Sequence, residues 1–484
     1  MEKNINRKNT IGLTVASFGQ CIFISLTSMA LPMFFTDVLY IAPAMVSVIF
    51  LITRIWDAIN DPMMGAIVDK TNTRWGKCRP FLLFSAIPLF IFTIMMFFPI
   101  NENSDVKFGY YLAAYLLFIT SYTALDIPLA GIKPLLFTDP DKRNKAMSMS
   151  STFGSLGSLF AIDLFFIIVQ IFGGSNVKRG YFLTVLLLST IGLVTLISGF
   201  FTVKEVVPIK KNNKSFWNTL KIVTKNKYMF MIIITSFLSM GVSGYGVMLP
   251  YFAKWNLADS FNFGVFSVEA IMIPILSTVT GIIFMVAVFI TPYLLKWISK
   301  RKLFFFMSII GIVLNLISFS FGYRNLYVFM ALRFLAHIPP TITGTLCVFM
   351  LADTLDYAEF NNGERTEGIS YAVNNLVGKA GNAIFSALML FLLGFFGYNV
   401  MVSEPALEIG ESIINNYSKM LDGIFFMMTI FPAISLFLQM IPMLFYKFDD
   451  ESHKRIIKEL NIRRGLLNTI DLTKSNEATV EVTI

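Results

Sequence analysis

Twelve apolar runs, each long enough to cross a lipid bilayer, constrain this chain more than any other feature of its sequence. A transmembrane helix needs about 20 mostly apolar residues, because the hydrocarbon core of a bilayer is about 30 Å thick. The predicted spans occupy residues 11–35, 45–68, 80–99, 109–136, 148–172, 180–203, 229–253, 266–295, 303–322, 325–351, 370–397 and 421–446. The pattern predicts an all-α integral membrane protein.

The composition argues against a soluble fold. Charged residues make up 14% of the chain and hydrophobic residues 55%, whereas soluble domains carry about 25% charged residues. The first apolar run is too long for the apolar region of a cleaved signal peptide, so we interpret it as the first span. The cysteines Cys21, Cys78 and Cys347 have no ligand spacing, and we expect no disulfide, no cofactor and no metal other than a coupling ion. The only histidines are His337 and His453, so the sequence does not predict an enzyme.

The net charge of +9 comes from Lys and Arg in short segments between the apolar runs. This is the positive-inside pattern of cytoplasmic loops, not a basic stripe that binds nucleic acid. We therefore predict a multi-pass protein of the cell membrane with both termini in the cytoplasm. The basic segments fall at 70–79, 142–145, 204–227 and 296–302.

A lysine-rich break at 204–228 divides the predicted spans into six and six. We expect a six-helix bundle at 1–203, a cytoplasmic linker at 204–228, a second six-helix bundle at 229–446 and a cytoplasmic tail at 447–484. Two pseudo-repeated halves of this kind form the major facilitator arrangement, in which the substrate binds between the halves.

The second predicted span contains two carboxylates. Asp57 and Asp61 are four residues apart, so they share one helical face, and Asn60 lies beside them. A carboxylate near the bilayer centre costs roughly 3 kcal/mol even on the insertion scale, so a positive partner is expected. Arg54 could neutralise Asp57, but this leaves Asp61 without a partner. The sharper hypothesis is a site for Na⁺ or a proton.

The fourth and eleventh spans carry further polar residues. Thr123 and Asp126 lie three residues apart, and a hydroxyl beside a carboxylate suits an alkali ion or a pair of sugar hydroxyls. A structural ion pair is the alternative for Asp126. Lys379, which follows Asn374 and Asn375, can neutralise a carboxylate of the other half, and snorkelling to an interface is its alternative. Three other polar residues are interpreted as structural or interface residues: Asp163, Arg333 and His337.

The predicted cytoplasmic side holds a second group of charges. The turn after the second span is basic, whereas the segment after the tenth span is acidic. If the two halves bring these segments together, their ion pairs close the cytoplasmic mouth, and solvated surface charge is the alternative. The predicted gate consists of Asp69, Arg74, Arg143, Asp353, Asp356 and Arg365.

Taken together, these segments resemble the glycoside–pentoside–hexuronide:cation symporter family. The shared motifs are Arg54-x-Trp56-Asp57-Ala-x-Asn60-Asp61-Pro62, Arg74-Trp75-Gly76-Lys77-x-Arg79-Pro80, Asp126-Ile127-Pro128 and Ala352-Asp353-x-x-Asp356-Tyr357-x-Glu359. The resemblance implies twelve helices in two bundles that move a sugar together with Na⁺, Li⁺ or H⁺.

The resemblance also implies roles for single residues. Asp126 corresponds to a sugar-binding aspartate of the family, and Lys379 to the lysine that connects the sugar and cation sites. The family's cation site corresponds to Asp57, Asn60, Asp61 and Thr123. Its cytoplasmic charge network corresponds to Arg143, Asp353, Asp356 and Arg365.

The chain departs from the family's best-known member at several positions. Cys21, after Gln20, stands in place of a sugar-binding aspartate, Ala130 and Ser151 replace a tryptophan and an arginine, and Lys133 adds a positive charge. The predicted substrate site consists of Gln20, Cys21, Asp126, Asn374, Asn375 and Lys379.

The predicted function is secondary active symport of a glycoside, pentoside or hexuronide with Na⁺ or H⁺, by alternating access. The departures leave an acidic sugar open as the substrate. A non-sugar solute such as a lysolipid is the alternative. The sequence distinguishes neither the coupling ion nor an oligomeric state.

Overall fold

A computed structural model of the chain describes residues 2–100, 103–133, 136, 140–205, 226–257, 267–323, 325–362, 367–398, 411–448 and 450–463. Within these residues, twelve helical segments are long and apolar enough to cross a membrane. The predicted fold class, an all-α membrane protein with twelve spans, is confirmed. Most of the predicted linker, 206–225, lies outside the described residues.

The first six spans are built from eight α-helices and two π-helical segments. They are α1 (Glu2–Ser25), η1 (Leu26–Ala30), α2 (Leu31–Met33), η2 (Phe34–Val38), α3 (Pro43–Lys70), α4 (Arg79–Phe84), α5 (Ala86–Met96), α6 (Ser104–Ile132), α7 (Pro140–Gly173) and α8 (Val177–Thr202). The first span comprises α1 to η2, and the third comprises α4 and α5.

The second six spans follow the same plan, with a broken first span. Their elements are α10 (Lys227–Ser239), η4 (Met240–Ser243), α11 (Gly244–Tyr251), η5 (Phe252–Asn256), α12 (Val268–Leu294), α13 (Lys300–Phe321), α14 (Leu326–Asn362), α15 (Glu367–Phe395) and α17 (Glu411–Phe445). A polar helix, α18 (Asp450–Arg463), follows them. The predicted end of the tenth span, at 351, is wrong by about three turns because α14 continues through the acidic segment to Asn362.

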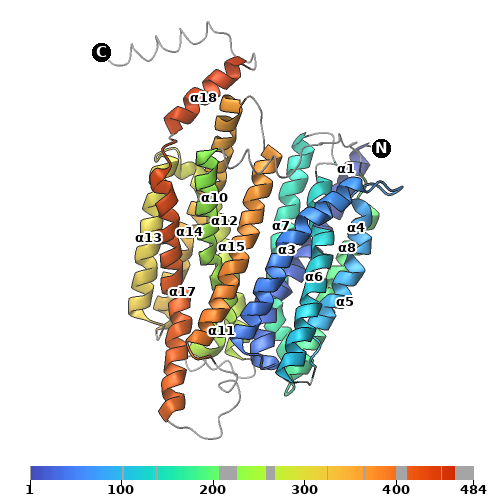
Figure 1. Ribbon diagram of the computed structural model, residues 1–484, viewed down its shortest axis with the longest axis vertical. Helices are drawn as coiled ribbons and strands as arrows, with labels where there is room; N and C mark the ends of the chain where they lie inside the picture. Colours follow the sequence, from blue (N-terminus) through green and yellow to red (C-terminus); the bar gives the residue numbers. More distant parts are fainter. Residues whose placement is uncertain are drawn as a thin grey trace.

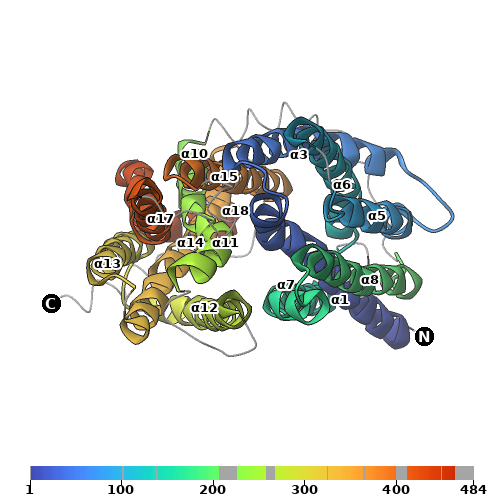
Figure 2. The same ribbon diagram turned by 90° about the horizontal axis from the view of Figure 1, so that it is seen from below.

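The helices form two groups that lie side by side, α1–α8 and α10–α17 (Figures 1 and 2). We call the end where α1 begins and α18 lies the terminal face, and the opposite end the distal face. The helices α3 and α15 approach each other toward the distal face and diverge toward the terminal face (Figure 1).

Small residues let α1 pack closely in the centre of the first group. A Cβ atom at Gly157 of α7 would lie 2.4 Å from the carbonyl oxygen of Phe18. A Cβ atom at Gly19 would lie 2.1 Å from the Thr195 hydroxyl of α8. Membrane helices use such residues because close backbone approach replaces the hydrophobic driving force that lipid does not supply.

The first span of each group ends in a π-helical segment next to a Leu-Pro pair. Pro32 lies two residues before η2, and Pro250 lies two residues before η5. Because proline has no N–H, Pro32 and Pro250 leave the carbonyls of Ser28 and Gly246 without their i→i−4 partners. The two segments occupy equivalent places in the two halves and meet at the distal face.

Candidate functional site

A cluster of charges lies between the two groups of helices, halfway across the molecule. The Nζ atom of Lys379 on α15 lies 2.8 Å from Oδ2 of Asp61 on α3 and 3.2 Å from Oδ2 of Asp126 on α6. The other oxygen of Asp126 accepts a hydrogen bond of 2.6 Å from Nε2 of Gln20 on α1. The structure thus brings together four of the residues predicted from the sequence, and one lysine connects both halves.

The carboxylates of α3 form a partly unsatisfied oxygen site. Asp57 is 5% exposed and accepts a hydrogen bond of 3.1 Å from the Thr123 hydroxyl. Oδ1 of Asp61 and Nδ2 of Asn60 are buried and have no hydrogen-bond partner. A buried carboxylate oxygen without a donor is costly, and it suits a hard cation, which prefers oxygen ligands. The predicted cation-site residues therefore lie together, and one carboxylate oxygen, Oδ1 of Asp61, accepts no hydrogen bond.

Arg54 does not provide the missing positive charge. No ion pair joins it to Asp57 in the described part of the chain, and its buried Nε atom has no partner. The guanidinium lies instead near the buried hydroxyl of Tyr115. The alternative in which Arg54 neutralises Asp57 is not what this conformation shows.

The other predicted substrate residues lie less close to the cluster. Cys21 is a free, half-buried thiol next to Gln20, and its electrostatic neighbours include Lys133 and Asp126. Asn375 is exposed, and the buried Oδ1 atom of Asn374 has no hydrogen-bond partner. Neither asparagine bonds to Lys379 among the described residues, although all three lie on α15.

Several polar contacts between the halves lie closer to the distal face, and two of them involve buried acids. Asp163 on α7 accepts hydrogen bonds from the hydroxyls of Ser277 and Thr278 on α12, the second at 2.6 Å. This places Asp163 at the interface. Sequence reasoning missed the contact of the other acid, Asp37 of η2. Asp37 forms an ion pair with Lys254 of η5 and accepts a hydrogen bond from the Tyr398 hydroxyl. The signal in the sequence was an acid and a lysine, each a few residues after a Leu-Pro pair in equivalent spans.

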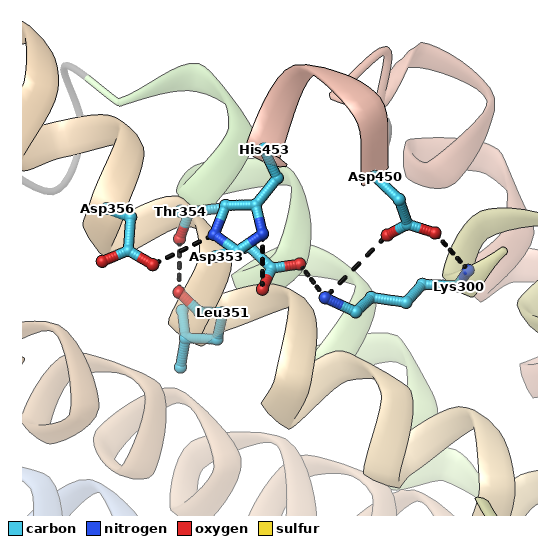
Figure 3. Close-up of polar contacts among 7 residues, drawn as sticks. All are labelled: Lys300, Leu351, Asp353, Thr354, Asp356, Asp450 and His453. Carbon is cyan, nitrogen blue, oxygen red and sulfur yellow. Dashed lines mark hydrogen bonds and ion pairs between the residues drawn. The ribbon is translucent and has the colours of Figure 1, made fainter. Parts of the chain in front are cut away.

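Two of the predicted gate acids, Asp353 and Asp356, contact residues of their own half at the terminal face (Figure 3). Asp353 forms an ion pair with Lys300 of α13 and lies 3.6 Å from Nδ1 of His453 on α18. Asp356 lies 3.0 Å from Nε2 of the same histidine. Asp450 caps this cluster by accepting a hydrogen bond of 3.1 Å from the Lys300 backbone.

On the basic side of the predicted gate, only Arg74 has a described side chain. Arg74 is exposed and stacks on Trp75, with 5.0 Å between its guanidinium carbon and the ring centroid. The side chains of Asp69 and Arg143, and all of Arg365, lie outside the described residues. The gate between the halves therefore stays a prediction for a conformation closed at the terminal face.

The polar contacts between the halves define the conformation. Hydrogen bonds and ion pairs join the two groups at the central cluster and nearer the distal face. The side chains of Lys379 and Asp126 are nevertheless 34% and 25% exposed. Because the distal end is closed by contacts, this exposure is toward the terminal face.

Solved structures with the same arrangement of helices are transporters. A bacterial homologue of the human lysosomal transporter Spinster, in an inward-facing and unoccupied conformation, aligns with a TM-score of 0.66, 12% sequence identity and coverage of 94% of this chain and 98% of that chain. The nucleoside transporter NupG aligns with a TM-score of 0.61 and 14% identity over 91% and 99% of the two chains. The fold shared with them is a multi-pass membrane fold of two helix groups, and in this chain buried charges lie between the groups.

The chain belongs to the family described as MFS/sugar transport protein, which it matches over residues 12–450. An isoprimeverose transporter of Lactiplantibacillus pentosus is 28% identical over 90% of this chain and 88% of its own length. A glucuronide carrier protein homolog of Escherichia coli (strain K12) is 25% identical over 96% and 97%. The similarity to both relatives covers nearly the whole of each chain.

Proposed function

We propose that this chain moves a sugar across the cell membrane together with Na⁺ or H⁺, by alternating access. The observation that carries the proposal is the position of Lys379, which pairs with Asp61 of the oxygen site and with Asp126, the predicted sugar-binding residue. Membership of the sugar transport family and the names of the relatives support a glycoside or sugar acid as the solute.

The orientation follows from the basic segments. The turn at 70–79, the start of α7 and the Lys300–Lys302 run all lie at the terminal face (Figure 1). Since basic loops stay in the cytoplasm, we assign the terminal face to the cytoplasm and the distal face to the outside. The conformation described here then faces inward, and Lys379 is reached from the cytoplasm.

The geometry supports a simple coupling mechanism. Without a coupling ion, Lys379 neutralises Asp61, so a sugar that draws Lys379 away leaves a buried carboxylate unpaired. When a cation is held by Asp57, Asn60, Asp61 and Thr123, Lys379 is released from Asp61. The pair of Lys379 and Asp126 can then donate to one sugar hydroxyl and accept from its neighbour. Each solute thereby favours the binding of the other.

Uptake measured with a panel of radiolabelled sugars tests the proposal. Proteoliposomes would receive glycosides, pentosides and uronides, with and without Na⁺ and with an imposed pH gradient. Accumulation of one sugar, driven by one ion, is the expected result. If folded protein accumulates none of them, including under a combined Na⁺ and pH gradient, cation-coupled sugar transport is wrong and a lysolipid becomes the next solute to test.

A further inference from the structure

The distal closure between the halves is centred on Asp37, a residue that the proposed sugar and cation sites do not use. Its carboxylate is 3% exposed and both of its oxygens are satisfied. Oδ2 accepts from Nζ of Lys254, whereas Oδ1 accepts from the Tyr398 hydroxyl and, at 2.7 Å, from the neighbouring Thr36 hydroxyl. Two of the three donors come from the other half of the molecule.

Aromatic side chains of the second half enclose this carboxylate. The Tyr251 hydroxyl lies 2.9 Å from that of Thr36, and the Tyr251 and Tyr398 rings are 5.5 Å apart, edge to face. The Trp255 ring packs on Tyr398 at 6.2 Å and supports Lys254, whose ammonium lies 4.9 Å from the indole centroid. The Asp37 carboxylate is therefore shielded, whereas the Lys254 side chain is 27% exposed. The shielding of the acid makes the interaction stronger than between two fully exposed charges.

The closure exists because both first spans end in equivalent π-helical segments. In η2 the wide turn presents Thr36 and Asp37, and in η5 it presents Lys254 and Trp255. The acid comes from one pseudo-equivalent segment and the base from the other. Separating the halves at the distal face would expose the Asp37 carboxylate to water as well, where the pair contributes little.

We propose that Asp37 is the gate acid of the distal mouth: its bonds to Lys254 and Tyr398 hold the transporter closed to the outside, and their rupture sets the population of the outward-facing conformation. Asp37 is a positioning residue in this scheme and touches neither solute. The assignment of the distal face to the outside, and its opening during transport, rest on the alternating access proposed above. The test of the gate proposal needs neither sugar nor coupling ion, so the two proposals can fail separately.

The chain contains its own reporter for this test. Cys21 is half-buried beside the central cluster, whereas Cys78 and Cys347 are buried. A membrane-impermeant maleimide therefore reads access to the centre from whichever side it is added. In right-side-out vesicles of the unmodified protein, Cys21 should label slowly, and in inverted vesicles it should label rapidly. Cys21→Ser provides the background of the assay.

The decisive variants remove one partner at a time. Lys254→Met and Asp37→Asn should each raise the labelling rate of Cys21 from outside about tenfold or more, because a charge-assisted hydrogen bond of the closed state is lost. Tyr398→Phe, which keeps the ion pair, should give a smaller rise. The matched control is Lys178→Met. Lys178 lines a distal pocket of about 730 Å³ together with Asp37 and Lys254, and it does not bond to Asp37.

The exchanged pair, Asp37→Lys with Lys254→Asp, distinguishes the bond from a general loss of packing. It should return labelling from outside toward the rate of the unmodified protein. If Asp37→Asn does not fold, the labelling rates of Lys254→Met and of the exchanged pair test the proposal. Unchanged labelling in Lys254→Met, or an equal rise in Lys178→Met, overturns the proposal.

Discussion

Replacing Asp61 by Asn should abolish the coupling between the two solutes while leaving sugar binding intact. In the structure, Oδ2 of Asp61 holds Lys379 at 2.8 Å, and its other oxygen has no partner. A sugar that recruits Lys379 in the absence of the coupling ion must break this bond. An asparagine at position 61 carries no charge, so it makes no such demand on the lysine.

The expected magnitude follows from the bond that is broken. A hydrogen bond between charged groups contributes about 1.5–3 kcal/mol, which corresponds to a roughly 10- to 150-fold difference in sugar affinity with and without the coupling ion. In Asp61→Asn this ratio should fall to about 1, and the affinity should approach that of the ion-bound unmodified protein. Uphill accumulation should be lost, while sugar exchange continues.

Titration calorimetry in nanodiscs measures both affinities directly. The sugar found by the uptake panel would be titrated with and without Na⁺, and at two pH values. Asp163→Asn is the matched control, because Asp163 is an acid between the halves that bonds to hydroxyls and not to Lys379. A ratio that stays above tenfold in Asp61→Asn would refute the coupling argument.

Three further substitutions test other parts of the structure. Asp126→Asn should abolish sugar binding but retain binding of the coupling ion that the uptake panel finds, and retained sugar binding contradicts its role. Gly157→Leu should lower the unfolding temperature measured by scanning fluorimetry by several degrees or more, because its side chain collides with Phe18, and an unchanged temperature would show that α1 and α7 can separate. Glu205→Gln should raise proteolysis of the turn 71–78, since Glu205 accepts hydrogen bonds of 2.8–2.9 Å from the backbone of Lys77–Arg79; equal proteolysis argues that the turn is held otherwise.

The hydrophobic pattern was sufficient to predict the number and order of the spans, because lipid allows few alternatives to a helix. It also indicated the central site, since Asp57, Asp61, Asp126 and Lys379 are costly at that depth and need one another. Helical spacing alone could not show that Asp61 and Asp126 share Lys379. That relation depends on how the two halves approach each other.

The distal closure and the arrangement around α18 were not predictable in the same way. Asp37 and Lys254 lie at the ends of apolar runs, where a charge needs no explanation. Their meeting depends on two π-helical turns that periodicity does not reveal. The tail was predicted only as a polar segment, and the contact of His453 with Asp353 and Asp356 requires α18 to fold back onto α14.

The two faces of the molecule satisfy their charges in opposite ways. At the distal face Asp37 pairs with a lysine of the other half, whereas at the terminal face Asp353 pairs with Lys300 of its own half. If Asp353 and Asp356 exchange these partners for Arg143 when the terminal face closes, charges released at one face are compensated at the other. Opening then leaves no buried charge unpaired, and the two conformations can lie within a few kcal/mol of each other, as a small differential solute affinity requires.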